Sequence, residues 1–182
     1  MNAVPVAGAL PAAAPGGSEE RLSLLFDAHH DRLYRLARRL TPNPDDALDL
    51  VQETFLKAAA AASSIPHAPG GQEAWLVRIL VNIRRDQWRR TRVRRRHALQ
   101  ADGAPPATTG PEKALIARRL VWQALDALNP RRRAVLVMHE IEGLSVPEIA
   151  SLLGIAAVTV RWHLSRGRRE LARRLRSQGV VS

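Results

Sequence analysis

Apolar residues recur at helical spacing along most of this chain, and no segment shows the apolar–polar alternation of a half-buried strand. Between residues 18 and 40 the apolar positions that share one helix face are Leu22, Leu25, Phe26, Leu33, Leu36 and Leu40. Hydrophobic residues make up 46% of the chain but aromatic residues only 4%, so its cores must be built from aliphatic side chains, which favours helices. The sequence therefore predicts an all-α fold.

Two stretches rich in alanine, proline and glycine divide the chain. Residues 1–17 carry no charge and predict a disordered tail, and residues 98–111 carry one charge, Asp102, and predict a flexible linker. We therefore expect two small helical domains, at 18–97 and 112–182. Within them, proline and glycine place a loop at 63–72.

The charge balance points to a polyanionic partner. The chain has 28 basic and 17 acidic residues, a net charge of +11, and is expected to bind nucleic acid or an anionic membrane surface. It has no cysteine, which excludes disulfides, thiolate catalysis and a cysteine-ligated zinc. No apolar run approaches the roughly 18 residues of a membrane span, and residues 1–17 lack the basic start of a secretory signal. We expect a cytoplasmic protein without membrane insertion.

A helix-turn-helix is the strongest pattern in the sequence. Ser145 and Glu148 have the spacing of a capping box, Gly154 marks a turn, and a second helix is expected from 157 to 176. Its outer face is basic, as a helix entering the major groove requires. A hairpin with a merely solvated basic face is the alternative. The outer-face residues are Val158, Arg161, Trp162, Ser165, Arg166 and Arg169.

Several further residues have two readings each. His163 falls beside the apolar stripe of the second helix and is expected to pack or to contact a phosphate. The run 131–133 is either three phosphate-binding arginines or a solvated charge run.

A second basic face is expected on a helix at 73–97. Arginines with an interleaved tryptophan suit a single strand of nucleic acid, because phosphates pair with arginine and unstacked bases lie on aromatic rings. A solvated, basic helix end is again the alternative. The face consists of Arg78, Arg85, Trp88 and Arg92.

The helix expected from Asn43 to about residue 62 is acidic instead. Its first turns hold Asp45, Asp46, Asp49, Gln52 and Glu53, which would repel DNA and so should meet a basic protein partner or water. Carboxylates at helical spacing could also bind the metal ion of a metal-dependent nuclease, which is an alternative function. Helix capping, however, explains most of these acidic residues. We predict no metal site and no cofactor.

Three parts of the sequence resemble extracytoplasmic-function (ECF) sigma factors of the sigma-70 family. Stretches 25–37 and 45–57 resemble the polymerase-binding part of that family. Stretch 74–82, with Asp86 and Arg89, resembles its −10 recognition helix, and stretches 124–145 and 159–161 resemble its −35 domain. Both halves match in order, across nearly everything outside the tail and the linker.

The resemblance implies a role for each surface. Core RNA polymerase is the expected protein partner, through the coiled-coil of its largest subunit and through its flap. The coiled-coil would bind Asp49, Leu50, Gln52, Glu53 and Phe55. The melted −10 strand would contact Asn82, Arg85, Asp86 and Arg89, with a flipped base captured by loop 63–72. Thr159 would join the −35 helix. An anti-sigma factor is a further expected partner.

We therefore expect a sigma factor that acts by binding and is not an enzyme. The alternatives are a helix-turn-helix regulator that acts without polymerase and a DNA-processing enzyme. Two departures from the family leave the promoter sequence open. Alanines follow Lys57 where an aromatic is common, and loop 63–72 is rich in proline and glycine, which leaves the −10 preference open. Trp162 and His163 stand where small or basic residues are common, which leaves the −35 sequence open.

Overall fold

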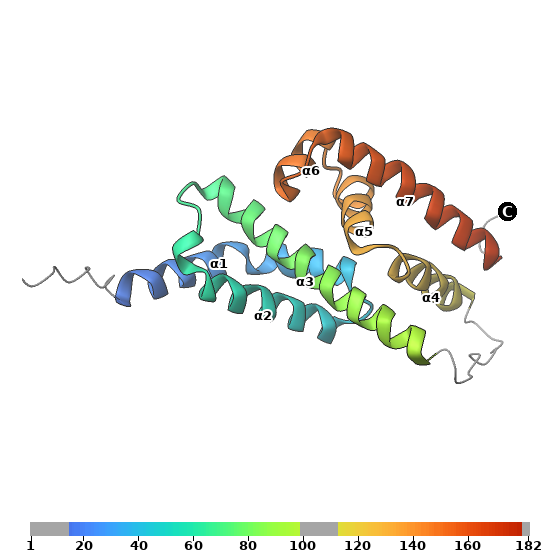
Figure 1. Cartoon of the computed structure of the whole chain (residues 1–182), viewed down its shortest axis with the longest axis horizontal. Helices are drawn as coiled ribbons and strands as arrows, with labels where there is room; N and C mark the ends of the chain where they lie inside the picture. The colour runs from blue at the N-terminus through green and yellow to red at the C-terminus, as the bar shows by residue number, and fades with distance from the viewer. Residues whose placement is uncertain (1–14, 99–112, 180–182) are drawn as a thin grey trace, which may run out of the picture.

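A computed structural model describes residues 15–98 and 113–179 of the chain. Every regular element in these ranges is a helix, as predicted. The elements are α1 (Pro15–Leu40), α2 (Pro44–Ala60), η1 (Ala62–Ser64), α3 (Pro69–Ala98), α4 (Lys113–Asp126), α5 (Pro130–Leu136), η2 (Val137–Ile141), α6 (Val146–Leu153) and α7 (Ala157–Ser177), as Figure 1 shows. None of these helices combines the length and apolar character that a membrane span needs.

Helices α1, α2 and α3 pack side by side as the first half of the molecule (Figure 1). Aliphatic side chains from all three helices fill its core, and the fully buried ones include Leu33, Leu36, Leu50, Leu76 and Leu80. Asn43 caps α2 by accepting a 2.7 Å hydrogen bond from the Asp46 N–H, and Pro44 occupies the first turn. The start of α2 therefore lies where the sequence predicts it.

The second half is built around α5 and α7. Asn129 caps α5, and beyond Leu136 the helix widens into the π-helical turn η2. The N–H of Glu142 then donates to the Val137 carbonyl at 3.1 Å. Gly167 lets α7 approach α5 closely, since a Cβ at this position would lie 2.9 Å from Cδ1 of Leu136.

The predicted helix-turn-helix is present in α6 and α7. Ser145 and Glu148 form the capping box of α6, with both reciprocal hydrogen bonds in place. Gly154 ends α6 with φ of 62°, a left-handed conformation that glycine adopts without steric cost. The turn then leads directly into α7.

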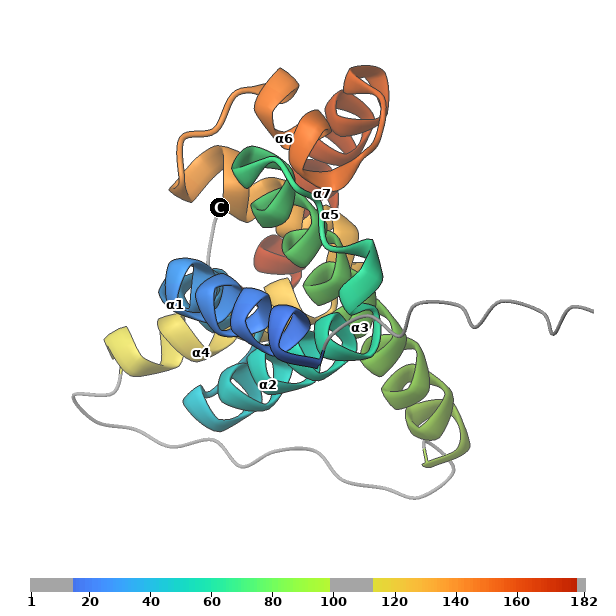
Figure 2. The same cartoon turned by 90° about the vertical axis from the view of Figure 1, so that its left-hand side faces the viewer.

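The two halves pack against each other, which the sequence did not predict. Helix α3 contacts α5 and α6 as well as α1 and α2, and Figure 2 shows it between the two halves. Buried residues of both halves form one continuous apolar cluster. The predicted linker lies outside the described residues except for Ala98, which belongs to α3.

Two predicted boundaries were wrong. Residues 15–17 belong to α1 instead of the tail, and residues 69–72 belong to α3 instead of the loop. Pro15 and Pro69 are the first residues of these helices. Proline suits a first helical turn because its missing N–H would have no partner there, so each proline marks a helix start where we had predicted irregular chain.

Candidate nucleic-acid and protein interfaces

The outward face of α7 carries the residues predicted to read duplex DNA. Val158 and Trp162 leave 67% and 52% of their surface exposed, although both are large and apolar. Thr159 is partly buried. The polar members of the face are all exposed: Arg161, Ser165, Arg166 and Arg169. The opposite side of α7 is buried at Val160, Leu164 and Gly167.

Trp162 is held by a residue from a different helix. The guanidinium of Arg132 on α5 lies 5.2 Å from the centre of the indole. Arg132 Nη1 in turn donates to Glu170 Oε2 at 2.9 Å, and the other oxygen of Glu170 accepts from Arg174 at 3.1 Å. The indole therefore ends a chain of polar contacts that links α5 to α7.

His163 sits beside Trp162 with its ring edge-on to the indole, at a centroid distance of 5.0 Å. Burial lowers the pKa of His163, and the charges of Arg132 and Arg131 lower it further. Its Nδ1 is buried without a hydrogen-bond partner among the described residues. The predicted packing role fits this placement.

Arginines surround an open pocket of about 800 Å³ beside the C-terminal part of α7. Its lining consists of Arg132, Arg166, Arg168, Arg169, Glu170, Ala172, Arg173 and Arg176. Glu170 is the one acidic residue of this lining, and it is already bound to Arg132 and Arg174. The pocket therefore favours anions such as phosphate groups.

The run 131–133 does not act as one unit. Arg133 is only 2% exposed, so its reading as a phosphate contact was wrong. Its guanidinium lies 5.0 Å from the centre of the Trp122 ring and 3.3 Å from Asp126. Burial lowers the pKa of Arg133 to about 10, against the opposing charge of Asp126.

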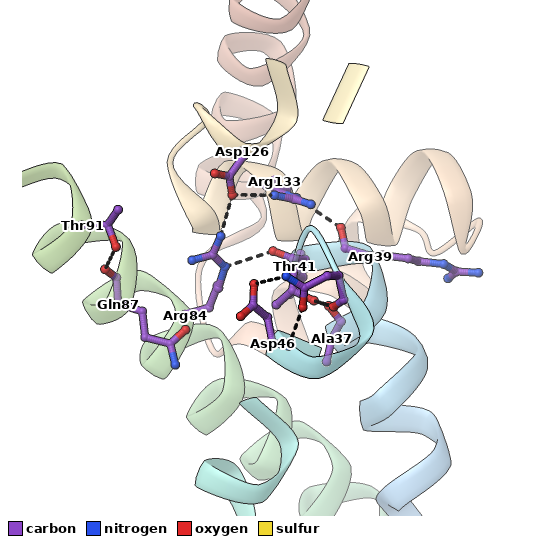
Figure 3. A network of polar contacts seen from close by, with 11 residues as sticks. Ala37, Arg39, Thr41, Asp46, Arg84, Gln87, Thr91, Asp126 and Arg133 are labelled. Carbon is purple, nitrogen blue, oxygen red and sulfur yellow. Dashed lines mark hydrogen bonds and ion pairs between the residues drawn. The ribbon is translucent and has the colours of Figure 1, made fainter. Parts of the chain in front are cut away.

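Arg133 is also part of the contact between the halves, which Figure 3 shows from close by. Its Nε donates to the Arg39 carbonyl at 3.1 Å. Arg84 of α3 shares Asp126 with it, at 2.6 Å, and donates to the Leu40 carbonyl at 3.0 Å. One carboxylate of the second half thus binds two arginines, one from each half.

A second carboxylate, Glu142, binds the other half directly. Its two oxygens accept 2.7 Å hydrogen bonds from Arg32 and Arg39 of α1, and its side chain is only 7% exposed. Arg32 also binds Glu73, at 3.1 Å. Although burial alone would lower the pKa of Arg32, the hydrogen bond and charge of Glu142, together with Glu73, raise it. Sequence reasoning missed this cluster, because its partners lie more than 100 residues apart.

The predicted single-strand face of α3 is only partly open. Arg89 is exposed, whereas Asn82, Arg85, Asp86 and Trp88 are partly buried. Arg85 pairs with Asp86 at 3.4 Å. Arg92 lies in α3, but its side chain is outside the described residues.

Arg78, also part of this face, is partly buried and lies against the other half of the molecule. A Cβ built on Gly154, in the turn between α6 and α7, would lie 3.1 Å from Nη1 of Arg78. Access to this guanidinium therefore depends on how the halves are placed.

The candidate polymerase-binding residues of the acidic helix α2 differ in their exposure to solvent. Asp49 and Gln52 are exposed, and Glu53 accepts from Gln87 of α3 at 3.1 Å. Leu50 is fully buried, so its prediction as a contact residue was wrong: it faces the core. Phe55 is 8% exposed and packs on the Phe26 ring, at 4.8 Å between centroids.

Exposed apolar residues on α1 and α2 had not been singled out as candidates. Leu24, Phe26, Leu48 and Leu56 leave between 41% and 70% of their surface exposed. On α2, exposed apolar side chains therefore occur together with exposed carboxylates, a composition that suits binding to another protein.

Two family models match the two halves of the chain. Residues 25–94 match sigma-70 region 2, and residues 118–171 match sigma-70 region 4. The ECF RNA polymerase sigma factor SigE of Mycolicibacterium smegmatis is 41% identical over 152 residues, which cover 81% of this chain but only 58% of that relative. The ECF RNA polymerase sigma factor SigM of Mycobacterium tuberculosis is 34% identical over 168 residues, covering 91% of this chain and 83% of that relative.

Two solved structures are similar over most of the chain. CnrH, in complex with the cytosolic domain of CnrY, gives a TM-score of 0.57 at 28% identity, covering 89% of this chain and 92% of that one. The sigma factor RpoE of Bartonella quintana, in complex with the anti-sigma factor NepR, gives a TM-score of 0.51 at 27% identity, covering 87% and 96%.

Proposed function

The chain belongs to the ECF sigma factors of the sigma-70 family, and we propose that it binds core RNA polymerase and directs it to specific promoters. It acts in the cytoplasm by binding alone, without a cofactor or a catalytic residue. The observation that carries this proposal is that one chain has exposed arginines on α3 and α7 and exposed carboxylates and apolar side chains on α2.

The half at 112–182 reads the −35 element as duplex DNA. The exposed arginines Arg161, Arg166 and Arg169 supply phosphate and base contacts, with Ser165, Val158, Trp162 and the partly buried Thr159 beside them. The pocket lined by arginines at the C-terminal part of α7 extends the positive surface along the DNA backbone.

The half at 18–97 binds the melted −10 strand through α3. The exposed Arg89 binds phosphates, and the partly buried Asn82, Arg85, Asp86 and Trp88 of the same helix supply base contacts. Arg78 joins them only when its contact with the turn at Gly154 opens. The −10 surface therefore becomes complete when the halves separate.

Helix α2 binds the polymerase through the coiled-coil of its largest subunit, and the flap is a further polymerase contact. Asp49 and Gln52 make the direct contacts because they are exposed, and Glu53 and Phe55 border them. Leu50 supports the helix from the core. An anti-sigma factor regulates the chain, as the complex of RpoE with the anti-sigma factor NepR supports by similarity.

In vitro transcription with purified bacterial core polymerase and fragments of the chain's own genome tests this function. We expect a restricted set of start sites that depends on the added protein. Asp49→Lys should abolish both transcription and polymerase capture, whereas Glu20→Lys, an equal charge reversal at an exposed site near the start of α1, should leave both intact. Tight binding to isolated duplex DNA with no transcript would favour the helix-turn-helix regulator instead.

A further inference from the structure

Trp162 is a large apolar side chain exposed to solvent on a face that also carries exposed arginines. It is 52% exposed, and Val158, one helical turn earlier on the same face, is 67% exposed. The exposed arginines Arg161, Arg166 and Arg169 flank this pair. Because that charge pattern fits a DNA backbone, the partner that covers Trp162 is a duplex rather than another protein.

Only one apolar group is available to such a side chain in the major groove. Base edges there present hydrogen-bond donors and acceptors, and the 5-methyl group of thymine is the exception. The indole ring carries one N–H donor and no lone-pair acceptor, and the rest of its edge is apolar. Most of the Trp162 ring is therefore suited to a methyl group, and only its N–H can pair with a base acceptor.

The orientation of the indole is set before DNA binds. Arg132 lies 5.2 Å from the ring centre, and its own position is set by Glu170 at 2.9 Å. These two side chains are 21% and 16% exposed, so their ion pair is shielded from solvent. His163 closes the edge of the ring at 5.0 Å. A side chain that is already ordered loses less entropy on binding than a mobile one.

We propose that Trp162, held in place by Arg132 and Glu170, reads the 5-methyl group of a thymine in the −35 duplex. Trp162 is then a specificity residue, and Arg132 and Glu170 are positioning residues that act through it. This inference rests on the proposed function and adds to it the chemical group that is recognised.

The test uses holoenzyme and a −35 duplex from a promoter at which that holoenzyme starts transcription. Each thymine of the −35 element is replaced in turn by deoxyuridine, which removes the methyl group and leaves every hydrogen-bonding group in place. We expect one position at which binding weakens about fourfold, the loss that one buried methyl group accounts for. At this position Trp162→Ala should bind the two duplexes equally.

The positioning role of Arg132 is tested by the ratio of the affinities for the thymine duplex and the deoxyuridine duplex. Arg132→Met should reduce the preference for thymine over deoxyuridine, and Arg132→Lys, which keeps the charge beside the ring, should restore much of it. If Arg132 only bound a phosphate, Arg132→Met would weaken both duplexes equally. Arg168→Met is the matched control: Arg168 pairs with Glu140 and lines the arginine pocket, so its loss should weaken both duplexes alike and leave the preference for thymine unchanged.

Two outcomes overturn the proposal: equal binding of thymine and deoxyuridine at every position by the unchanged protein, or a full preference retained by Trp162→Ala. Trp162→Phe and circular dichroism of each variant separate loss of reading from loss of folding. Absence of any transcript would instead refute the proposed function, so the two failures are distinguishable.

Discussion

Replacing Glu142 by glutamine should loosen the contact between the two halves of the molecule. The carboxylate is 7% exposed and accepts two hydrogen bonds of 2.7 Å, from Arg32 and Arg39. Glutamine keeps one acceptor oxygen and turns an NH2 group toward the other arginine. The variant therefore loses one charged hydrogen bond and the attraction of both cations.

The magnitude follows from the surroundings of the three side chains. Removing one partner of a fully buried ion pair costs roughly 3–5 kcal/mol. Here Arg32 is 24% and Arg39 is 37% exposed, and Arg32 keeps Glu73, so both guanidinium groups regain part of their hydration or pairing. Discounting for this solvent access, we expect a cost of about 2 kcal/mol to the closed arrangement.

Urea denaturation measures this cost, and small-angle X-ray scattering measures the opening as a larger radius of gyration. Glu140→Gln is the matched control, because Glu140 pairs with Arg168 within the second half and both side chains are about half exposed. That exposed pair should contribute at most about 1 kcal/mol. If Glu142→Gln cost no more than the control and left the radius of gyration unchanged, the reasoning would be refuted.

Three further predictions concern the second half. Gly154→Ala should destabilise the protein by about 1–2 kcal/mol in urea denaturation, because φ is 62° and the new Cβ would press on Arg78; an unchanged midpoint would contradict this turn. Since the pKa of His163 lies below its ordinary value of 6.5, the unfolded chain binds a proton more readily, so stability should be complete above pH 6.5 and fall as the pH drops below it. Denaturation at pH 7, 6 and 5 should show this loss, and His163→Gln should reduce it; an identical pH dependence in both proteins would exclude His163 as the cause. Arg166→Ala should reduce the slope of log K against log salt for −35 duplex binding by about 1, measured by fluorescence anisotropy; an unchanged slope would mean that Arg166 binds no phosphate.

Local signals made much of the fold predictable. The cap at Asn43 and the capping box of Ser145 and Glu148 are set by residues three positions apart, so their side chains meet as soon as a helix forms. The orientation of α7 was predictable for the same reason: apolar residues at helical spacing must face the core, and the arginines then face outward.

Two errors came from reading charge or family position without periodicity. Three consecutive residues lie about 100° apart around a helix, so the arginines at 131–133 cannot share one face. Arg133 is the one directed inward, four positions before the buried Val137. Leu50 likewise falls between the buried Ala47 and Thr54, and this spacing alone would have placed it in the core.

The contact between the halves left no signal in the sequence. Glu142 and Arg32 are 110 residues apart, and the hydrogen bond from Arg133 to the Arg39 carbonyl spans 94 residues. Such pairs form only once two separate helical units dock. The arginine beside Trp162 was hidden in the same way, because it comes from α5 and not from α7.

The π-helical turn η2 determines whether Glu142 can reach the other half of the molecule. Its extra residue makes the Glu142 N–H reach back five positions to Val137 instead of four. Deleting one residue from this turn would restore an ordinary helix and swing everything after it by about 100° around the axis. The Glu142 carboxylate would then point away from α1. A deletion of one residue in this turn is therefore expected to break the contacts of Glu142 with Arg32 and Arg39, although all three residues remain in the chain.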